Sequence, residues 1–202
     1  MKYRLTDETI KRKGFTLHRI QATKDFGNVH KGDLGGFIEN ESNLSHDGNA
    51  WVYDNAKAYG EALVYENARI YTFAEVHDNA RVYGNVQVHD NACVCDNAWV
   101  HDNVKVCGNA KVYGDVWVYG DVKVYDEAKI CDNAQICGYA RVHGNAWVYG
   151  EAWVWNNAEI YGDALVFDNA WVCDEAKVYG DARVCGKAWV HGDDRVCNEV
   201  WV

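Results

Sequence analysis

The sequence predicts an all-β fold, a three-sided parallel β-helix with 18 residues per coil and a small β cap at its N-terminal end. A six-residue pattern runs without insertion from Ala50 to Val202. Of the 26 positions found by counting every sixth residue from Ala50 to Val200, 20 are Ala and five are Val. Two residues after each comes Val or Ile, with Ala58 as the exception. A period kept this strictly indicates stacked structural repeats.

Each hexad reads as a short strand followed by a corner. In Ala-x-Val the two apolar residues point to one side of an extended chain, and the residue between them points to the other. A polar pair such as Gly84-Asn85 then turns the chain. Six residues span at most about 20 Å, which leaves a side of about 16 Å after the corner is allowed for. Three such sides enclose a core with an inscribed radius of about 4.6 Å, which Val and Ala can fill. A fourth side would leave a void. Residues 18 apart should therefore stack.

The N-terminal residues do not follow the hexad. Residues 2–5 and 17–22 alternate apolar and polar side chains, and Lys11-Arg12-Lys13-Gly14 lies between them, which predicts a β-hairpin. Because a solenoid must cover its core and its free strand edge, we expect this hairpin to cap the coil. The predicted organisation is a cap over residues 1–28 and a β-helix over 29–202, forming one continuous domain.

The repeat resembles a known family. Ala80-Arg81-Val82-Tyr83-Gly84-Asn85 is similar to the hexapeptide repeat of left-handed parallel β-helix proteins, and this resemblance alone implies left-handed winding. Residues 32–39, 43–45 and 49–52 resemble the opening of uncharacterised hexapeptide-repeat proteins of bacteria and their phages. The two resemblances cover about residues 2–202. They imply an association with a phage or prophage and no established reaction.

Composition bounds the compartment. No apolar run approaches the length of a membrane span, and no apolar segment follows the first residues as in a signal peptide, so the expected localisation is cytoplasmic, with no membrane partner. A disulfide needs Cα atoms within about 7 Å, yet no two cysteines are 18 apart. We therefore expect free thiols in a reducing compartment. The cysteines are Cys93, Cys95, Cys107, Cys131, Cys137, Cys173, Cys185 and Cys197.

One outward column is rich in tryptophan. Such a wall would exceed the apolar surface that monomers usually expose, which predicts an interface; the alternative is stacking that only supports the sheet. The predicted interface residues are Trp99, Trp117, Trp153, Trp155, Trp171 and Trp189.

A second outward column is basic and lies beside tyrosines. It could hold a nucleotide or polyanion, although acids at the corners favour local charge compensation, and nucleic acid is not expected as a direct ligand. The stripe comprises Arg69, Lys105, Lys123, Arg141, Lys177 and Arg195.

Three His–Cys pairs are 18 apart and should stack: His77 with Cys95, His89 with Cys107, and Cys173 with His191. Each pair offers half of a tetrahedral zinc site, but plain stacking along a column is the favoured interpretation, so no metal, cofactor or catalytic residue is predicted. The hexapeptide family also includes CoA-dependent acyltransferases and carbonic anhydrases. Those activities imply a histidine in a projecting loop or at a subunit boundary, and this repeat has no such loop.

The favoured function is therefore a non-enzymatic binding or assembly protein, which associates with itself and with a host protein. The alternative is a CoA-dependent acyltransferase with its site between subunits. A second alternative is an inhibitor that mimics DNA or sequesters a nucleotide, because the net charge is −10. Asp194 occupies an inward position near the C-terminal end, and we expect Asp194, Val196 and Val202 to form an end contact, with Asp194 limiting its growth.

Overall fold

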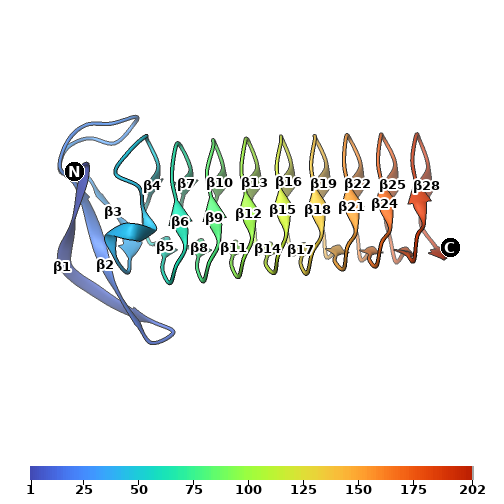
Figure 1. Ribbon diagram of the computed structural model, residues 1–202, viewed down its shortest axis with the longest axis horizontal. Coiled ribbons are helices and arrows are strands. Elements are labelled where there is room, and N and C mark those ends of the chain that lie inside the picture. Colours follow the sequence, from blue (N-terminus) through green and yellow to red (C-terminus); the bar gives the residue numbers. More distant parts are fainter. Residues whose placement is uncertain (202) are drawn as a thin grey trace.

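The protein is a single column of stacked coils. The computed structural model describes the backbone of residues 1–201 and side chains through residue 198. Figure 1 shows the coils side by side along the long axis, with the N-terminal hairpin at one end and the C-terminus at the other. Within residues 1–201 the coils and the N-terminal hairpin form three sheets of twelve, nine and eight strands, so the predicted parallel β-solenoid is confirmed. Its hand stays a prediction.

The twelve-stranded sheet, called the hairpin sheet below, contains the N-terminal strands. Its strands are β1 (Tyr3–Arg12), β2 (Phe15–Ala22), β3 (Leu34–Ile38), β5 (Lys57–Ala58), β8 (Glu75–Val76), β11 (Cys93–Val94), β14 (Lys111–Val112), β17 (Lys129–Ile130), β20 (Trp147–Val148), β23 (Leu165–Val166), β26 (Arg183–Cys185) and β29 (Glu199–Trp201). A short 3₁₀ helix, η1 (Glu41–Asn43), precedes the regular coils.

The nine-stranded sheet, called the cation sheet, comprises β4 (Trp51–Val52), β7 (Arg69–Ile70), β10 (Gln87–Val88), β13 (Lys105–Val106), β16 (Lys123–Val124), β19 (Arg141–Val142), β22 (Glu159–Ile160), β25 (Lys177–Val178) and β28 (Arg195–Val196). The eight-stranded sheet, called the tryptophan sheet, comprises β6 (Leu63–Val64), β9 (Arg81–Val82), β12 (Trp99–Val100), β15 (Trp117–Val118), β18 (Gln135–Ile136), β21 (Trp153–Val154), β24 (Trp171–Val172) and β27 (Trp189–Val190).

The inward columns pair residues 18 apart, as predicted. Val88 pairs with Ile70 on one side and with Val106 on the other, and Val106 pairs with Val124. These side chains and the inward alanines are fully buried. Because most strands of the coils are only two residues long, the fold is held by hydrogen bonds between coils, such as Lys105 N–H to the carbonyl of Val122 at 2.9 Å.

The 18-residue register fails at both ends of the solenoid. Phe37 pairs with Lys57, 20 residues later, because η1 adds residues to the first coil. At the other end Arg183 pairs with Glu199, 16 residues later, where the hexad predicts Trp201. This pairing is shifted by two residues relative to the hexad. A shift of two residues keeps the alternation of inward and outward positions, so the corner before β29 can be shorter without turning the inward side chains outward.

The N-terminal hairpin is confirmed, with a longer first strand than expected. The turn is Lys13-Gly14, with φ angles of 47° and 90°. At the other end of the hairpin the cap is tightly held: Tyr3 Oη donates to the carbonyl of Leu44 at 2.7 Å, and Lys2 Nζ to that of Ala50 at 2.8 Å. Burial lowers the pKa of Lys2 to about 8.

The cap also changes the environment of Trp51, which the repeat places on an outward face. The structure buries this side chain, leaving it 1% exposed, because Phe26 and Tyr3 from the N-terminal segment pack against it. Its ring centroid lies 5.3 Å from that of Phe26. Trp51 therefore belongs to the core beneath the cap.

In the last regular coil the inward position held by Asp194 is exposed to solvent. This side chain is exposed, and its carboxylate accepts a hydrogen bond from the N–H of His191 at 3.2 Å, while Val196 is partly buried. Val202, the third residue of the expected end contact, lies outside the described residues. The end contact stays a prediction.

Within the described part of the chain, no helix combines the length and the apolar character needed to cross a membrane. The prediction of free thiols is confirmed for Cys93, Cys95, Cys107, Cys131, Cys137, Cys173 and Cys197.

Candidate functional site

Three surfaces hold the candidate functional residues, and the first is the tryptophan sheet. Its outward column presents Trp117, Trp153, Trp171 and Trp189 with exposed fractions of 44, 40, 46 and 62%. Trp99 and Trp155 are only partly exposed. Single exposed aromatics are ordinary on protein surfaces, but several gathered along one sheet, here with Gln135 between Trp117 and Trp153, indicate an interaction site. The structure thus brings the six predicted interface residues onto one sheet.

Stacking within the column accounts for part of this surface. The rings of Trp99 and Trp117 stack at a centroid distance of 4.9 Å, and Arg81 lies over Trp99 at 4.6 Å. Near the C-terminal end, Trp153 and Trp171 stack at 5.9 Å. These contacts stabilise neighbouring coils, yet they leave the outer faces of four rings in solvent. Support of the sheet is therefore not their full explanation.

The tryptophan sheet is also poor in charge. Arg81 is the one charged residue in its outward column, which otherwise holds Leu63, Gln135 and the tryptophans. The hairpin sheet and the cation sheet both carry several charged outward residues. Two chains that meet on the tryptophan sheet would therefore bury fewer charges than on either of the other sheets, where burying unpaired charges is costly.

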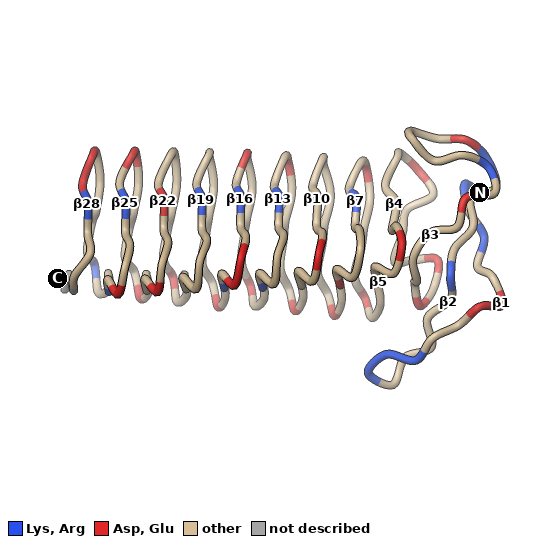
Figure 2. The backbone as a smooth tube through the Cα atoms, turned by 180° about the vertical axis from the view of Figure 1, so that it is seen from behind, with Lys and Arg blue, Asp and Glu red and all other residues tan. Residues whose placement is uncertain are grey.

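The second surface is the predicted basic stripe, and an acid divides it. Figure 2 shows Lys and Arg along the strands of the cation sheet, with an acidic residue on β22. That residue is Glu159, whose carboxylate lies 2.7 Å from Lys177 Nζ and 3.4 Å from His143 Nε2. Burial alone would raise the pKa of Glu159, but these partners outweigh it and lower the pKa.

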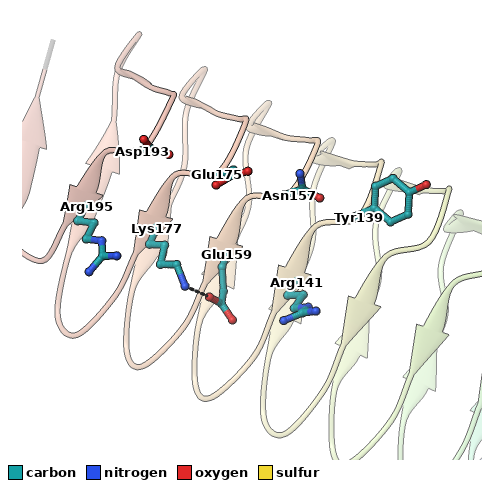
Figure 3. A pocket seen from close by; sticks show the side chains of 8 residues that line it. All are labelled: Tyr139, Arg141, Asn157, Glu159, Glu175, Lys177, Asp193 and Arg195. Carbon is teal, nitrogen blue, oxygen red and sulfur yellow. Dashed lines mark hydrogen bonds and ion pairs between the residues drawn. The ribbon is translucent and has the colours of Figure 1, made fainter.

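A groove of about 520 Å³ lies over the C-terminal part of the stripe. Figure 3 shows Arg141, Glu159, Lys177 and Arg195 in one row and Tyr139, Asn157, Glu175 and Asp193 in a parallel row. Three cations and three carboxylates therefore line it, so its net charge is near zero. This balance fits local charge compensation and gives no preference for an anion.

The middle of the stripe differs. A second groove, of about 310 Å³, is lined by Lys105, Lys123 and Arg141 against a single carboxylate, that of Asp121. Neutral Asn103 and Tyr139 complete the wall. The anion-binding stripe stays a prediction, and within it these three cations form the part with an excess of positive charge.

The third surface lies under the hairpin tip, where the sequence predicted no site. His77 follows β8 and is 4% exposed. Its Nε2 lies 3.3 Å from the Sγ of Cys93 on β11 and 3.3 Å from Lys13 Nζ on the hairpin turn. The side chains of His77, Cys93 and Cys95 have their donor atoms within 4.8 Å of one another. Although the repeat itself has no projecting loop, the hairpin supplies a projecting segment.

Hydrogen bonds and charge set the protonation of this cluster. The hydrogen bond from Cys95 lowers the pKa of Cys93 to about 5, with help from His77 and against the effect of burial. The pKa of Cys95 is raised, first by the same hydrogen bond and then by burial.

The period of the repeat does not join His77 to Cys93, because these two residues are 16 apart and not 18. In the structure a residue just after a strand also leans onto the outward residue 16 positions later, in the next coil. Tyr59 contacts Glu75 in this way, His143 contacts Glu159, and Trp189 Nε1 donates to Cys173 Sγ. Searching the sequence at a spacing of 16 would have joined His77 to Cys93.

Comparisons with known proteins agree with the fold. The family model described as the YdcK β-solenoid repeat matches residues 76–90, 134–150, 158–174 and 176–192. Each matched stretch is close to one coil, and together they cover about a third of the chain. These matches support a β-solenoid repeat relationship; they do not bear on a phage origin, which stays a prediction.

A partial match concerns a chain from Escherichia coli (strain K12), the "Uncharacterized acetyltransferase YdcK". The alignment is 68 residues long and 40% identical, and it covers 29% of this chain and 21% of the relative. The matching segment thus spans about a fifth of the relative's length.

Proposed function

We propose that this chain is a binding and assembly protein that associates with copies of itself through the tryptophan sheet. The observation that carries the proposal is the row of exposed tryptophans, Trp117, Trp153, Trp171 and Trp189, on a sheet almost without charge. Because the whole chain carries a net charge of −10, copies repel one another on average. The charge-poor sheet is where that repulsion is weakest and apolar burial is greatest.

The size of the sheet is sufficient for such a contact. Eight strands at about 4.8 Å and a side of about 16 Å give roughly 600 Å² for each copy. Two copies would bury about 1,200 Å², the lower limit of specific protein interfaces. The strands repeat at one spacing, so the same flat surface on a second copy matches it, as symmetric association requires.

The test replaces two adjacent exposed rings, Trp153→Glu with Trp171→Glu, and measures the oligomeric mass by light scattering. We expect the parent to be oligomeric and the variant to have a lower mass with unchanged β-sheet circular dichroism. The matched control is Trp147→Glu with Leu165→Glu, an adjacent outward pair in the same part of the hairpin sheet. A monomeric parent, or equal masses for both variants, would overturn the proposal.

A second candidate function is acyl transfer from CoA, and the observation favouring it is the partial match to a chain named an acetyltransferase. A protein that binds acetyl-CoA is stabilised according to the ratio of ligand to dissociation constant, by about 2.7 kcal/mol at 100 times that constant. A thermal unfolding series with acetyl-CoA should therefore show a rise in Tm for an acyltransferase. A flat series together with self-association supports the assembly function alone.

A further inference from the structure

We propose that His77, Cys93 and Cys95 form a binding site for a zinc ion, with Asp78 orienting the histidine. This site lies on the hairpin sheet, away from the tryptophan sheet, and does not depend on self-association. The ligands are one imidazole nitrogen and two thiolate sulfurs, the donor types that zinc prefers in proteins.

The repeat brings the three donors together. Cys93 and Cys95 are two residues apart on an extended segment, so both side chains point outward. His77 belongs to the preceding coil and leans across the coil spacing, which places Nε2 3.3 Å from Cys93 Sγ. All three donor atoms lie within 4.8 Å of one another. Small side-chain movements can bring them to the 2.0–2.3 Å metal distances typical of zinc.

The tautomer of His77 suits a metal ligand. Nδ1 lies 2.8 Å from a carboxylate oxygen of Asp78, and a carboxylate can only accept, so Nδ1 carries the proton. Nε2 is then the ring nitrogen left to bind a metal beside the thiols. Zinc-binding histidines commonly donate their other ring N–H to a carboxylate in this way, which fixes the ring and increases its basicity. Stacking on Tyr59, at a centroid distance of 4.9 Å, holds the ring further.

The hairpin tip lies beside the three ligands and lines the hollow next to them. Lys13 Nζ lies 3.3 Å from His77 Nε2, where its ammonium group takes the lone pair that a metal would use. Lys13 sits on an exposed turn at the end of a flexible side chain, so a metal ion can displace it. Tyr113, Lys111 and Lys129 line the same hollow, of about 330 Å³. Three protein ligands beside an open hollow match zinc sites that keep a fourth position for water or an anion.

A nearby cluster provides an internal comparison. His89, Asp90 and Cys107 also gather their donor atoms within 4.8 Å, but this set has one thiol and an exposed carboxylate in place of the second thiol. Soft thiolates select zinc over harder cations. The cluster with two thiols should therefore bind zinc more tightly than the cluster with one.

The experiment uses the full chain, reduced and dialysed against chelator, and titrates it with Co²⁺ and then Zn²⁺. We expect one Co²⁺ per chain, with thiolate-to-metal charge-transfer absorption and the visible bands of tetrahedral cobalt, all displaced by Zn²⁺. Cys93→Ser, Cys95→Ser and His77→Phe should each remove these signals; the phenylalanine keeps a ring on Tyr59. Asp78→Asn should weaken zinc binding by about 10- to 100-fold.

Cys107→Ser is the matched control and should bind zinc as the parent does, because it removes a stacked cysteine from the neighbouring cluster. Circular dichroism and thermal unfolding confirm that each variant is folded, and the three ligand variants test the site separately. A parent without the charge-transfer band overturns the proposal. So does zinc affinity that is unchanged in Cys93→Ser and Cys95→Ser, or equally reduced in Cys107→Ser.

Discussion

The carboxylate of Asp102 accepts a hydrogen bond at 2.9 Å from the backbone N–H of Gly120, one coil further along the chain. Burial would raise the pKa of Asp102, but the hydrogen bonds from His101 and Gly120 outweigh it and lower the pKa. In the same way, a glycine N–H donates to an aspartate carboxylate one coil earlier in the pairs Gly108 to Asp90, Gly114 to Asp96, Gly144 to Asp126, Gly150 to Asp132, Gly186 to Asp168 and Gly192 to Asp174. Much of the acidity thus has a structural role at the corners, which does not favour DNA mimicry.

The first prediction concerns this corner bond. Asp102 has a φ of 64°, a conformation that Asp and Asn adopt more readily than other side chains. Asp102→Ala removes the acceptor and keeps the unfavourable φ, so we expect a loss of about 1–2 kcal/mol in unfolding free energy. Asp102→Asn keeps an acceptor oxygen and should lose less. Urea unfolding at neutral pH measures both, and equal losses would contradict a role for the acceptor.

The second prediction separates steric contact from backbone strain at the corner glycines. A Cβ on Gly120 would lie 2.7 Å from the carbonyl oxygen of Gly138, and its φ is 87°. Gly180 has a φ of 63° but open space around its Cβ position. Gly180→Ala should therefore lose about 1–2 kcal/mol from the backbone alone, and Gly120→Ala should lose more. Comparable denaturant midpoints for the two variants would show that the coils move apart to admit the added methyl group at no cost in unfolding free energy.

The third prediction tests the inward column. Val106 is fully buried between Val88 and Val124, so Val106→Asp would place an unpaired charge in an apolar core. We expect loss of the cooperative unfolding transition and of β-sheet circular dichroism. Lys105→Asp, one residue earlier on the outward side of β13, is the control and should remain folded. A folded Val106→Asp protein would mean that the core admits water at this level.

The sequence predicted the regular coils because one physical rule repeats in them. Small residues such as Ala110 and aliphatic residues such as Val112 alternate with outward side chains, and nothing but a stack of 18-residue coils buries them all. The structure at the N-terminal end of the solenoid does not follow from this rule. The 20-residue spacing from Phe37 to Lys57 depends on η1, and the burial of Trp51 depends on contacts from Phe26, which lies outside the repeat.

The candidate sites were predictable to different degrees. The tryptophan column follows directly from the period, so its six residues were found from the sequence. For the cluster at His77, the sequence predicted only the stacking of His77 with Cys95. The contact of His77 with Cys93 joins residues 16 apart, which the 18-residue period does not place together. The approach of Lys13 follows from the length of β1 and the direction of the hairpin, which no local pattern specifies.

The fourth prediction concerns anions on the cation sheet. Lys105, Lys123 and Arg141 outnumber the one carboxylate in their groove, so inorganic pyrophosphate should bind there weakly and in a salt-dependent manner. Lys105→Glu with Lys123→Glu should abolish this binding in a calorimetric titration at low salt. Lys177→Glu with Arg195→Glu alters the charge-balanced groove and should leave the binding unchanged. Binding that survives the first pair of substitutions would place the anion elsewhere.

The fifth prediction is a pH dependence at Glu159. Its carboxylate is held by Lys177 at 2.7 Å, and its pKa in the folded protein is below the ordinary value of about 4.3. A carboxyl group with a lowered folded pKa binds more protons in the unfolded state, so stability rises with pH in that range. The contribution of Glu159 is therefore complete above about pH 4.3 and is lost as the pH falls through the lower, folded pKa.

The Glu159→Gln variant has no carboxyl group to ionise at this position. It should therefore be less stable than the parent at neutral pH, and its unfolding free energy should approach that of the parent as the solution is acidified. Because part of the ion pair is exposed to solvent, the difference should also shrink in high salt. Glu175→Gln is the control: Glu175 lines the same groove but is exposed and forms no ion pair within the described part of the chain. Unfolding free energies measured from pH 3 to pH 7 should converge for Glu159→Gln and the parent, and stay parallel for Glu175→Gln. Parallel curves for both variants would mean that Lys177 and His143 do not hold the carboxylate in solution.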